Sequence, residues 1–413
     1  MLRKAFSAFA VLFLLAVALA PFRIETATAE TITVPDDYPT IQEAINNANE
    51  GDTIFVSSGI YYENIVVNKT VSLVGENRST TIIDGNGFGT VLSLTANNVT
   101  ISGFTIQNHW YYYGIKVYSV DNRIINNTIT WNSYSIMLVA SNHNNISGNK
   151  ITNSQYGIGL GFEGPCDANI ISDNVIANNS QYGVGLWSWS KNNRIISNVF
   201  EKSAWGIGLR NSISNEIKDN VITNSTTAIE LGWNSDDNIV WLNTVTNNNI
   251  GISLVDSSNN TISKNNVTAN NWAGIELQHS SNNFVYHNNF AENKNHTVYS
   301  YNSVNLWDNG YEGNYWSDYN GTDSDGDGIG DTPYIIDGSN QDNYPLMAPY
   351  MLGDINHDAI VDIFDIASIA GIFGCSSVDP QWNPHCDVNE DSVIDIFDLV
   401  AVTVNFGKEW TSP

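Results

Sequence analysis

The sequence of 413 residues has little positive charge and few charged residues of either sign. It contains 16 Lys and Arg against 43 Asp and Glu, so its formal net charge is −27. Nucleic-acid binders and proteins that bind acidic membranes need a basic surface, and both classes are therefore excluded. Charged residues make up only 14 % of the chain and apolar residues 42 %, which is not the composition of a disordered protein.

Long apolar runs are absent except at the start of the chain. The basic pair Arg3-Lys4 precedes an apolar run over residues 5–22, and Ala27-Thr28-Ala29 follows as a small-x-small cleavage site. This order predicts a signal peptide over residues 1–29. The run is long for a signal sequence, so an uncleaved N-terminal anchor is the alternative. We expect a secreted or cell-surface protein with no transmembrane anchor after cleavage.

The middle of the chain repeats an asparagine at nearly constant spacing. Successive intervals are 22, 25, 24, 22, 23, 22 and 23 residues, and a second asparagine lies five residues before each member of the series. Each repeat reads N-x-[IV]-x-x-N-x-[IVF], and a fixed period of this size predicts a solenoid. The first series is Asn127, Asn149, Asn174, Asn198, Asn220, Asn243, Asn265 and Asn288, and the second is Asn122, Asn144, Asn169, Asn193, Asn215, Asn238, Asn260 and Asn283.

The length of the repeat favours a β-helix over a helical solenoid. About 22 residues allow three short strands and three turns, whereas two-helix repeats need about 33 or more. Asn, Gly, Ile, Ser and Thr dominate the repeats, and strong helix formers are scarce. Most coils add a third strand of the form G-[IV]-x-[LV], as at residues 206–209. We expect the asparagines to hydrogen-bond from coil to coil and the Ile and Val side chains to fill the core.

The first residues of the repeat region predict a cap for the solenoid. Thr40 can serve as the N-cap of a short amphipathic helix that begins at Ile41. This segment, VPDDYPTIQEAINNANEGDTIFV, and the closing string GNYWSDY resemble right-handed parallel β-helix proteins of the pectin-lyase-like superfold. The nearest sub-family is the NosD-type (periplasmic copper-binding) β-helix. The resemblance covers about residues 31–345 and implies an all-β fold without implying a function.

An acidic loop near the end of the β-helix has the spacing of a calcium site. Position 12 is Tyr334, so Asp318, Asp337 or Asp342 would have to supply the usual last acid. We expect one Ca²⁺ here, with a solvated acidic turn as the alternative. The predicted ligands are Asp323, Asp325, Asp327 and Asp331 at positions 1, 3, 5 and 9, with the carbonyl of Ile329 at position 7.

The last residues form a separate small module that follows a linker over residues 346–352. Within residues 353–407, two loops with calcium-ligand spacing each run into an apolar helix, Ile366 to Phe373 and Leu399 to Phe406. Two such loop–helix units resemble a type I dockerin, which implies two bound Ca²⁺ ions and a cohesin-domain partner. The implied ligands are Asp354, Asn356, Asp358, Ile360, Asp362 and Asp365 in the first loop, and Asp387, Asn389, Asp391, Val393, Asp395 and Asp398 in the second.

Two features of this module depart from or refine the dockerin pattern. Position 6 of the two loops is Ala359 and Ser392 where Gly is usual, and this costs about 1 kcal/mol if φ is positive there. Positions 10 and 11, which help to set partner choice in dockerins, repeat as an Ile-Phe pair in both units. The alternative for the two phenylalanines is packing within the chain. The implied cohesin-binding residues are Ile363, Phe364, Ile396 and Phe397.

The chain has three cysteines, of which Cys375 and Cys386 flank the segment between the two loops. An exported protein permits a disulfide between them, and we predict that bond. Cys166 lies in a coil with a longer repeat interval and has no evident partner.

Catalysis by the β-helix has weak support from the sequence. Glu230 and Glu276 are outward residues of the third strand, two coils apart with Ser253 between them. Two strand spacings are about 9.5 Å, near the upper limit for an inverting carboxylate pair. If the protein is an enzyme, it is a glycoside hydrolase or a polysaccharide lyase, and the alternative is that both residues are ordinary surface acids.

An aromatic residue recurs beside the third strand in five consecutive coils. Such a ladder can serve as a platform on which sugar rings stack, or the aromatic rings can stack on one another. Copper delivery, which the NosD resemblance would imply, has little support, because the chain has only seven His and four Met and no two His at ligand spacing on adjacent coils. The predicted glycan-binding residues are Tyr113, Tyr134, Tyr156, Tyr182 and Trp205.

These observations leave two hypotheses for the function. In the first, the protein is an exported glycan-binding or polysaccharide-processing β-helix that a calcium-dependent dockerin attaches to a cohesin-bearing partner. In the second, it is a structural surface protein whose β-helix is a rigid, glycosylated spacer.

Overall fold

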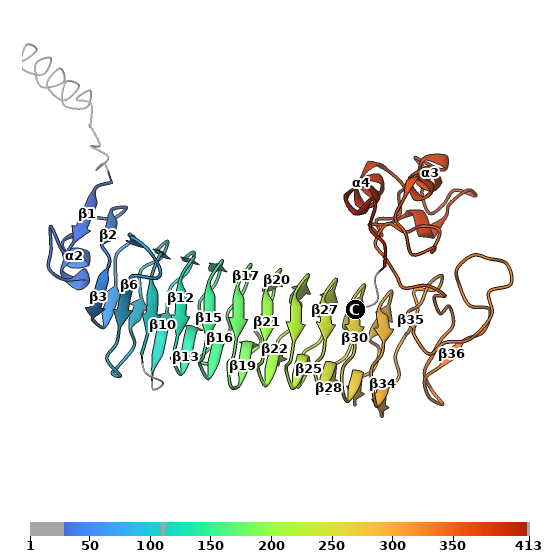
Figure 1. The fold of residues 1–413 in the computed structure, drawn as a ribbon, viewed down its shortest axis with the longest axis horizontal. Coiled ribbons are helices and arrows are strands. Elements are labelled where there is room, and N and C mark those ends of the chain that lie inside the picture. The colour runs from blue at the N-terminus through green and yellow to red at the C-terminus, as the bar shows by residue number, and fades with distance from the viewer. Residues whose placement is uncertain (1–28, 109–111, 411–413) are drawn as a thin grey trace, which may run out of the picture.

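The computed structural model describes residues 29–108 and 112–410, so the predicted signal peptide lies outside the described residues. The chain winds into a right-handed parallel β-solenoid whose coils stack along one long axis (Figure 1). Three parallel sheets form its faces, as the repeat predicts. Within the described part there are three α-helices, and none of them has the length and apolar composition of a membrane span.

Sheet A contains the strand that carries the aliphatic residue between the two asparagine series. Its twelve strands pair in parallel register throughout. In order they are β1 (Thr31–Val34), β2 (Thr53–Val56), β5 (Ser72–Gly75), β8 (Thr100–Ser102), β11 (Arg123–Ile125), β14 (Asn145–Ser147), β17 (Ile170–Ser172), β20 (Arg194–Ile196), β23 (Glu216–Lys218), β26 (Ile239–Trp241), β29 (Thr261–Ser263) and β32 (Phe284–Tyr286).

Sheet B contains the strand that directly follows the asparagine of the first series (Asn127 and its equivalents), and it also has twelve strands. They are β3 (Gly59–Tyr62), β6 (Thr81–Asp84), β9 (Thr105–Gln107), β12 (Thr128–Thr130), β15 (Lys150–Thr152), β18 (Val175–Ala177), β21 (Val199–Glu201), β24 (Val221–Thr223), β27 (Thr244–Thr246), β30 (Asn266–Thr268), β33 (Asn289–Ala291) and β35 (Tyr315–Trp316).

Sheet C holds the third strand of each coil and has eleven strands. They are β4 (Ile65–Val67), β7 (Leu92–Leu94), β10 (Tyr113–Val117), β13 (Tyr134–Leu138), β16 (Tyr156–Leu160), β19 (Tyr182–Leu186), β22 (Trp205–Arg210), β25 (Thr227–Gly232), β28 (Ile250–Val255), β31 (Ala273–Gln278) and β34 (His296–Tyr301). A short antiparallel pair, β36 (Tyr334–Ile335) and β37 (Gln341–Asp342), follows the solenoid.

Both predicted asparagine ladders are present, and their side chains are fully buried. Asn198 shows the pattern: its Nδ2 donates to the Oδ1 of Asn220 at 3.0 Å and to the carbonyl of Ile171 at 2.9 Å. Its own Oδ1 accepts from the backbone N–H of Asn174 at 3.0 Å. Each side chain therefore satisfies buried backbone groups at a turn that would otherwise lack partners.

A further ladder of small polar residues was not predicted, and it explains Cys166. The backbone N–H of Ser141 donates to the Sγ of Cys166 at 3.4 Å, and the N–H of Cys166 donates to the Oγ of Ser190 at 3.0 Å. Cys166 thus occupies a serine position in a ladder at the turn after sheet C. It is fully buried in the solenoid core.

Both ends of the solenoid are closed. The predicted N-terminal cap is confirmed: α2 (Ile41–Asn47) begins after Thr40, whose side chain accepts from the N–H of Glu43. At the other end Trp307 and Trp316 are almost fully buried. These large rings cover the last coil and keep water from its apolar interior.

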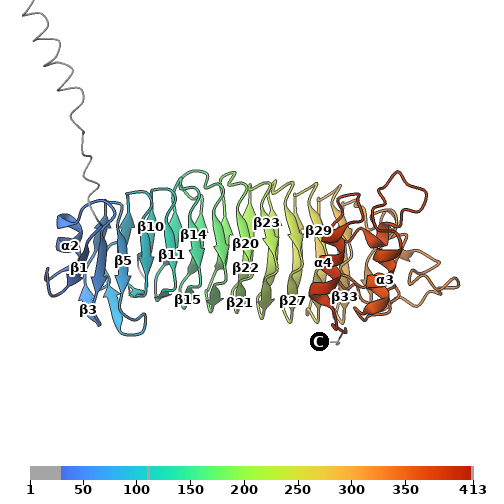
Figure 2. The ribbon, with the colours of Figure 1, turned by 90° about the horizontal axis from the view of Figure 1, so that it is seen from above.

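The C-terminal module lies beside the last coils of the solenoid, on the side away from sheet C (Figures 1 and 2). It contains α3 (Ile363–Gly371), a 3₁₀ turn (Pro384–Cys386) and α4 (Ile396–Asn405). Both helices begin three residues earlier than predicted, because Asp362 and Asp395 act as N-caps in capping boxes with Asp365 and Asp398. The loop acids at positions 9 and 12 thus also start the helices.

Candidate functional site

The two loops of the C-terminal module share one backbone conformation. At position 1, Asp354 accepts from the N–H of Ala359 at 2.8 Å, and Asp387 accepts from the N–H of Ser392 at 2.9 Å. Position 6 has positive φ in both, 67° at Ala359 and 71° at Ser392. Both side-chain-bearing residues are therefore in the left-handed region, where the backbone strain expected from the sequence applies.

The donor set of these loops fits a hard cation. Carboxylate, amide and carbonyl oxygens alternate along each loop, which is the arrangement that Ca²⁺ prefers. Burial, together with the nearby carboxylates of Asp365 and Asp358, raises the pKa of Asp354 to about 6. A cation among these acids would remove that electrostatic cost, because it would offset the repulsion between the carboxylates.

The loop at the end of the solenoid repeats the same geometry. Asp323 accepts from the N–H groups of Gly326 at 2.7 Å and Gly328 at 3.0 Å, and both glycines have positive φ. Carboxylate oxygens of Asp323, Asp325 and Asp327 lie within 4.8 Å of one another. Three oxygens from these acids can therefore reach one cation.

The structure limits which acid could complete that loop. Asp342 accepts from the N–H of Asn314 at 2.7 Å and from the Nε1 of Trp316 at 2.8 Å, inside the end of the solenoid. Asp337 accepts a hydrogen bond from the Nδ2 of Asn340 at 2.8 Å. Asp318 accepts from the hydroxyl of Tyr334, the position-12 residue, at 3.1 Å and remains exposed. Of the three alternatives, Asp318 is the one that is free to turn toward a cation.

The apolar residues at positions 10 and 11 are exposed on the module. Phe364 and Phe397 keep 65 % and 64 % of their surface accessible, and Ile363 and Ile396 are also exposed. The alternative of packing within the chain is therefore wrong for both phenylalanines. Each of the two loop–helix units therefore exposes one Ile and one Phe at the same two loop positions.

Position 4 of the two loops faces the solenoid. In the second loop, Glu390 forms an ion pair with Lys264 at 2.8 Å and accepts from the hydroxyl of Tyr286 at 3.0 Å. In the first loop the same position is His357, whose Nε2 lies 2.7 Å from the Oε1 of Glu312. The two halves of the module therefore meet the solenoid through different chemistry at one equivalent position.

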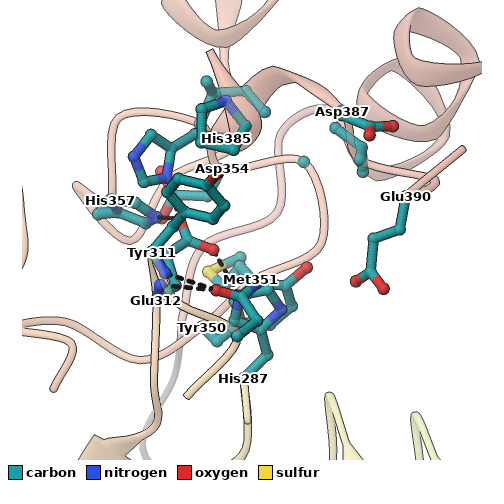
Figure 3. A pocket seen from close by; sticks show the side chains of 15 residues that line it. His287, Tyr311, Glu312, Tyr350, Met351, Asp354, His357, His385, Asp387 and Glu390 are labelled. Atoms are coloured by element: carbon teal, nitrogen blue, oxygen red, sulfur yellow. Dashed lines mark hydrogen bonds and ion pairs between the residues drawn. The ribbon is translucent and has the colours of Figure 1, made fainter. Parts of the chain in front are cut away.

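Glu312 is the centre of a buried cluster of histidines (Figure 3). His287 from the solenoid and His357 and His385 from the module all contact its carboxylate. Burial alone would raise the pKa of Glu312, but the three imidazoles hold it well below its usual value. Burial would lower the pKa of His357, and the Glu312 carboxylate instead raises it to about 9.

The repeat pattern did not predict this cluster. Its histidines do not lie on adjacent coils: His357 and His385 belong to the C-terminal module, and Glu312 belongs to the closing segment. These residues lie far apart along the chain and meet only because the module folds back onto the last coils. The sequence signal that could have suggested the cluster is the presence of His357 and His385 in or beside the two acidic loops of the module.

The predicted disulfide between Cys375 and Cys386 is not formed, and both cysteines are free. Cys386 is fully buried in the small core of the module, against which Cys375 packs. Burial raises the pKa of the Cys386 thiol to about 11, so little of the reactive thiolate forms near neutral pH. These cysteines act as small apolar core residues.

The five aromatic residues beside sheet C stack on one another in a column. The rings of Tyr134 and Tyr156 are 4.3 Å apart and nearly parallel, and those of Tyr182 and Trp205 are 4.8 Å apart. Tyr113 begins the column, stacked on Tyr134 at 5.3 Å. Most ring faces are therefore covered by neighbouring rings; Tyr182 is buried, and the other four residues are partly exposed.

Other aromatic residues next to this column expose their rings. Trp189 and Trp233, in turns that follow sheet C, are 56 % and 52 % exposed. The guanidinium of Arg210 lies 4.3 Å from the centre of the Trp233 ring. An exposed indole beside a charged group is a common element of sugar-binding surfaces, because it offers both a flat apolar face and a hydrogen-bond donor.

Glu230 and Glu276 occupy the predicted register, each beside Ser253 on sheet C. Glu276 is nearly buried and accepts from Ser253 at 3.0 Å and from Gln278 at 2.7 Å. Glu230 lies 3.4 Å from Arg210, and burial raises its pKa. A carboxyl with a raised pKa can act as a general acid, but both groups are held by protein partners.

Fold and sites define a parallel β-helix protein with an appended acidic module. A family model described as "Periplasmic copper-binding protein (NosD)" matches residues 43–228 and 166–321, together more than half of the chain. The chain therefore belongs to the NosD family. His357 and His385 lie outside the matched residues.

One curated relative and several solved structures are similar to the chain. A cell surface glycoprotein from Methanothermus fervidus is 30 % identical over 215 residues, which is 48 % of this chain and 35 % of the relative. The chain thus spans about a third of that relative's length. The family and the relative together indicate a surface β-helix protein with an extracellular or envelope location.

The similar solved structures show the fold alone, because their identity is low. DFA-IIIase from Arthrobacter chlorophenolicus A6, without its lid, matches at 13 % identity with a TM-score of 0.55, covering 67 % of this chain and 92 % of that one. A mannuronan C-5 epimerase A-module from Azotobacter vinelandii matches at 13 % with a TM-score of 0.53, covering 65 % and 87 %.

Proposed function

We propose that the chain is an exported surface protein whose β-helix binds glycans and whose C-terminal module is a calcium-dependent dockerin for a cohesin-type partner. One observation carries the docking part: Ile363, Phe364, Ile396 and Phe397 are all exposed at equivalent positions of two like units. Exposed clusters of large apolar side chains are uncommon on surfaces that stay in water, and they mark protein-binding sites.

The orientation of the module supports docking. Its position-4 residues, His357 and Glu390, contact the solenoid, whereas positions 10 and 11 stay accessible. A partner could therefore reach the apolar set without displacing the module. Because the set is repeated by the two units, a partner could bind in two orientations.

Binding of the full chain to a type I cohesin domain tests this proposal. We expect calcium-dependent binding that weakens at least about 100-fold in Phe364→Ala with Phe397→Ala, since central aromatic residues carry most interface energy. Val404→Ala is the matched control, because Val404 is 73 % exposed on α4 but is not at position 10 or 11. Equal loss in both variants, or no binding to a panel of cohesins in millimolar calcium, would reject the docking function.

Glycan binding would use the aromatic side of sheet C, opposite the module. The column from Tyr113 to Trp205 is partly exposed, and Trp189 and Trp233 add exposed faces beside it. Polysaccharide affinity electrophoresis of Trp189→Ala with Trp233→Ala, and separately of Tyr156→Ala with Trp205→Ala, tests this face. We expect both pairs to migrate faster than the parent chain in gels that contain a bound polysaccharide.

A rigid spacer without glycan binding is the second candidate function. The close stacking of Tyr134, Tyr156, Tyr182 and Trp205 favours it, because rings that cover one another stabilise the coil edges. Unchanged retention of both double variants, with intact folding, would support the spacer. Release of reducing sugar that is lost in Glu230→Gln would instead extend the first proposal to hydrolysis or lysis.

A further inference from the structure

The histidine cluster joins the C-terminal module to the end of the solenoid. His287 lies in the turn between β32 and β33, and Glu312 lies in the segment that closes the solenoid. His357 and His385 come from the module. Two side chains from each side therefore meet at one point, around a pocket of about 40 Å³ (Figure 3).

Three of the four side chains in this cluster have donor atoms within the reach of a single ion. One ligand atom each of Glu312, His357 and His385 lies within 4.8 Å of the others. Glu312 and His287 are each 5 % exposed, the side chain of His357 is 6 % exposed, and that of His385 is 23 % exposed at the edge of the cluster. A buried set of imidazoles with one carboxylate is typical of sites for divalent transition metals, whereas Ca²⁺ and Mg²⁺ prefer oxygen ligands.

The second nitrogen of His357 supports this assignment independently. The Nδ1 of His357 lies 3.3 Å from the backbone carbonyl of Asp327 while its Nε2 points to Glu312. A metal-ligating histidine is commonly oriented in this way, with its second nitrogen bonded to a carbonyl. His287 lacks this second bond, because its Nδ1 is buried without a hydrogen-bond partner; its ring is stacked on Tyr350 at 4.3 Å, and its Nε2 faces the Glu312 carboxylate.

We propose that Glu312, His357 and His385 bind one divalent transition metal ion, of the Zn²⁺ type, that fastens the C-terminal module to the β-helix. His357 and His385 contact the Oε1 of Glu312, and His287 holds the carboxylate through its Oε2. This site has imidazole nitrogens among its donors, whereas the donors of the three calcium-type loops are oxygens. It also does not depend on the cohesin or glycan proposals.

The position of His357 links this site to calcium. His357 is position 4 of the first loop, between the predicted calcium ligands Asn356 and Asp358. A calcium ion that orders this loop would hold His357 in place for the transition metal. Calcium binding and metal binding should therefore favour each other.

Calorimetric titration of the full chain with Zn²⁺, in millimolar calcium that saturates the oxygen sites, tests the proposal. We expect one Zn²⁺ per chain. His357→Asn with His385→Asn should weaken binding at least about 100-fold, because even outer partners of metal ligands contribute 10- to 100-fold. Asn is the replacement because His357 has a φ of 56°, which Asn tolerates.

The matched control is His143→Asn with His279→Asn. Both histidines are exposed and have positive φ, and neither belongs to the cluster. Equal Zn²⁺ affinity in cluster and control variants, or no Zn²⁺ binding by the parent chain, would overturn the proposal and leave a metal-free ion-pair contact. If the cluster variant does not fold, Glu312→Gln keeps the side-chain shape and must show the same loss of Zn²⁺.

Discussion

The solenoid and the C-terminal module are stabilised in opposite ways. The solenoid buries one continuous apolar core from Val34 to Trp316, and its polar turns are satisfied by ladders of side chains within the chain. The module has a core cluster of seven buried residues, and its loops bring carboxylates together. The solenoid supplies partners for its own buried polar groups, whereas the module gathers carboxylates in its loops and exposes apolar side chains at positions 10 and 11.

This difference follows from size and from periodicity. Every coil of the solenoid is covered by the next, so its buried surface grows with the number of repeats. A module of about 55 residues buries a smaller fraction of its surface and is marginally stable, so bound metal ions can add a large share of its stability. The comparison predicts that the stability of the module depends on bound ions, whereas the stability of the solenoid depends on its asparagine ladders.

Calcium removal should have the largest effect and should separate the two regions. Chelation should unfold the module and leave the solenoid folded. An ion that binds only the folded module adds about 4 kcal/mol of stability when its free concentration is about 1,000 times its Kd. Differential scanning calorimetry of the full chain should show two transitions, of which only the lower shifts with calcium. Asp354→Ala with Asp387→Ala should abolish that shift, and Glu409→Ala, at an exposed acid outside the ligand positions, should retain it. A single transition that is insensitive to calcium would contradict this view of the module.

Loss of one ladder residue should weaken the solenoid by about 3 kcal/mol. Asn198→Ala leaves the buried N–H of Asn174 and the carbonyl of Ile171 without their partners, and each unsatisfied group costs about 1–3 kcal/mol. Urea unfolding followed by tryptophan fluorescence measures this loss. Asn249→Ala is the control at an exposed asparagine and should change the unfolding free energy by less than about 0.5 kcal/mol. Equal effects of the two substitutions would mean that the ladder adds no stability.

Asp342 should make the stability of the solenoid end depend on pH. Burial raises its pKa to about 7 from the usual 3.8, although hydrogen bonds from Asn314, Trp316 and Tyr344 act in the other direction. Between these two values the folded chain holds a proton that the unfolded chain has released, so the contribution to stability falls as pH rises from about 4 to 7.

The variant Asp342→Asn cannot titrate at this position and provides the reference for that effect. The difference in melting temperature, parent minus variant, should fall across this range and then stay constant above about pH 7. Thermal melting in buffers of equal ionic strength and equal calcium measures this difference. A difference that is flat with pH would show that Asp342 ionises normally in the folded chain.

Glycine at loop position 6 should have the smallest effect, and in the stabilising direction. Ala359 and Ser392 have positive φ, which costs a side-chain-bearing residue about 1 kcal/mol. Ala359→Gly and Ser392→Gly should therefore each tighten calcium binding about fivefold in calorimetric titrations. Ala367→Gly inside α3 is the control and should instead destabilise the module, because glycine disfavours a helix interior. Weaker calcium binding in the loop variants would show that these positions are not strained.

Much of the solenoid could be predicted because its repeat is local. The asparagine series, the three strands per coil and the Thr40 cap were all correct, since each depends on residues within one coil or its neighbour. The aromatic residues were also placed correctly beside the third strand. Their self-stacking was left open, because ring orientation depends on side-chain packing across several coils.

The module was less predictable in its contacts than in its loops. The spacing of the acidic residues located both loops, but the predicted disulfide between Cys375 and Cys386 was wrong. Both thiols are free, with Cys386 buried in the small core and Cys375 packed against it. The starts of the helices were misplaced because Asp362 and Asp395 serve as caps. Both errors concern residue types with two structural roles: a cysteine can form a disulfide or pack as a free thiol, and an aspartate can be a loop ligand or a helix N-cap. The tertiary packing determines which role is taken.

The sequence by itself determined the coil, its ladders and the spacing of the acidic loops, because these are set by short-range periodicity. Only the tertiary structure decided that His287 and Glu312 of the solenoid meet His357 and His385 of the module. It also decided that Phe364 and Phe397 remain exposed. The physical reason is that these outcomes depend on how one folded region rests on another, and no local pattern of residues encodes that contact.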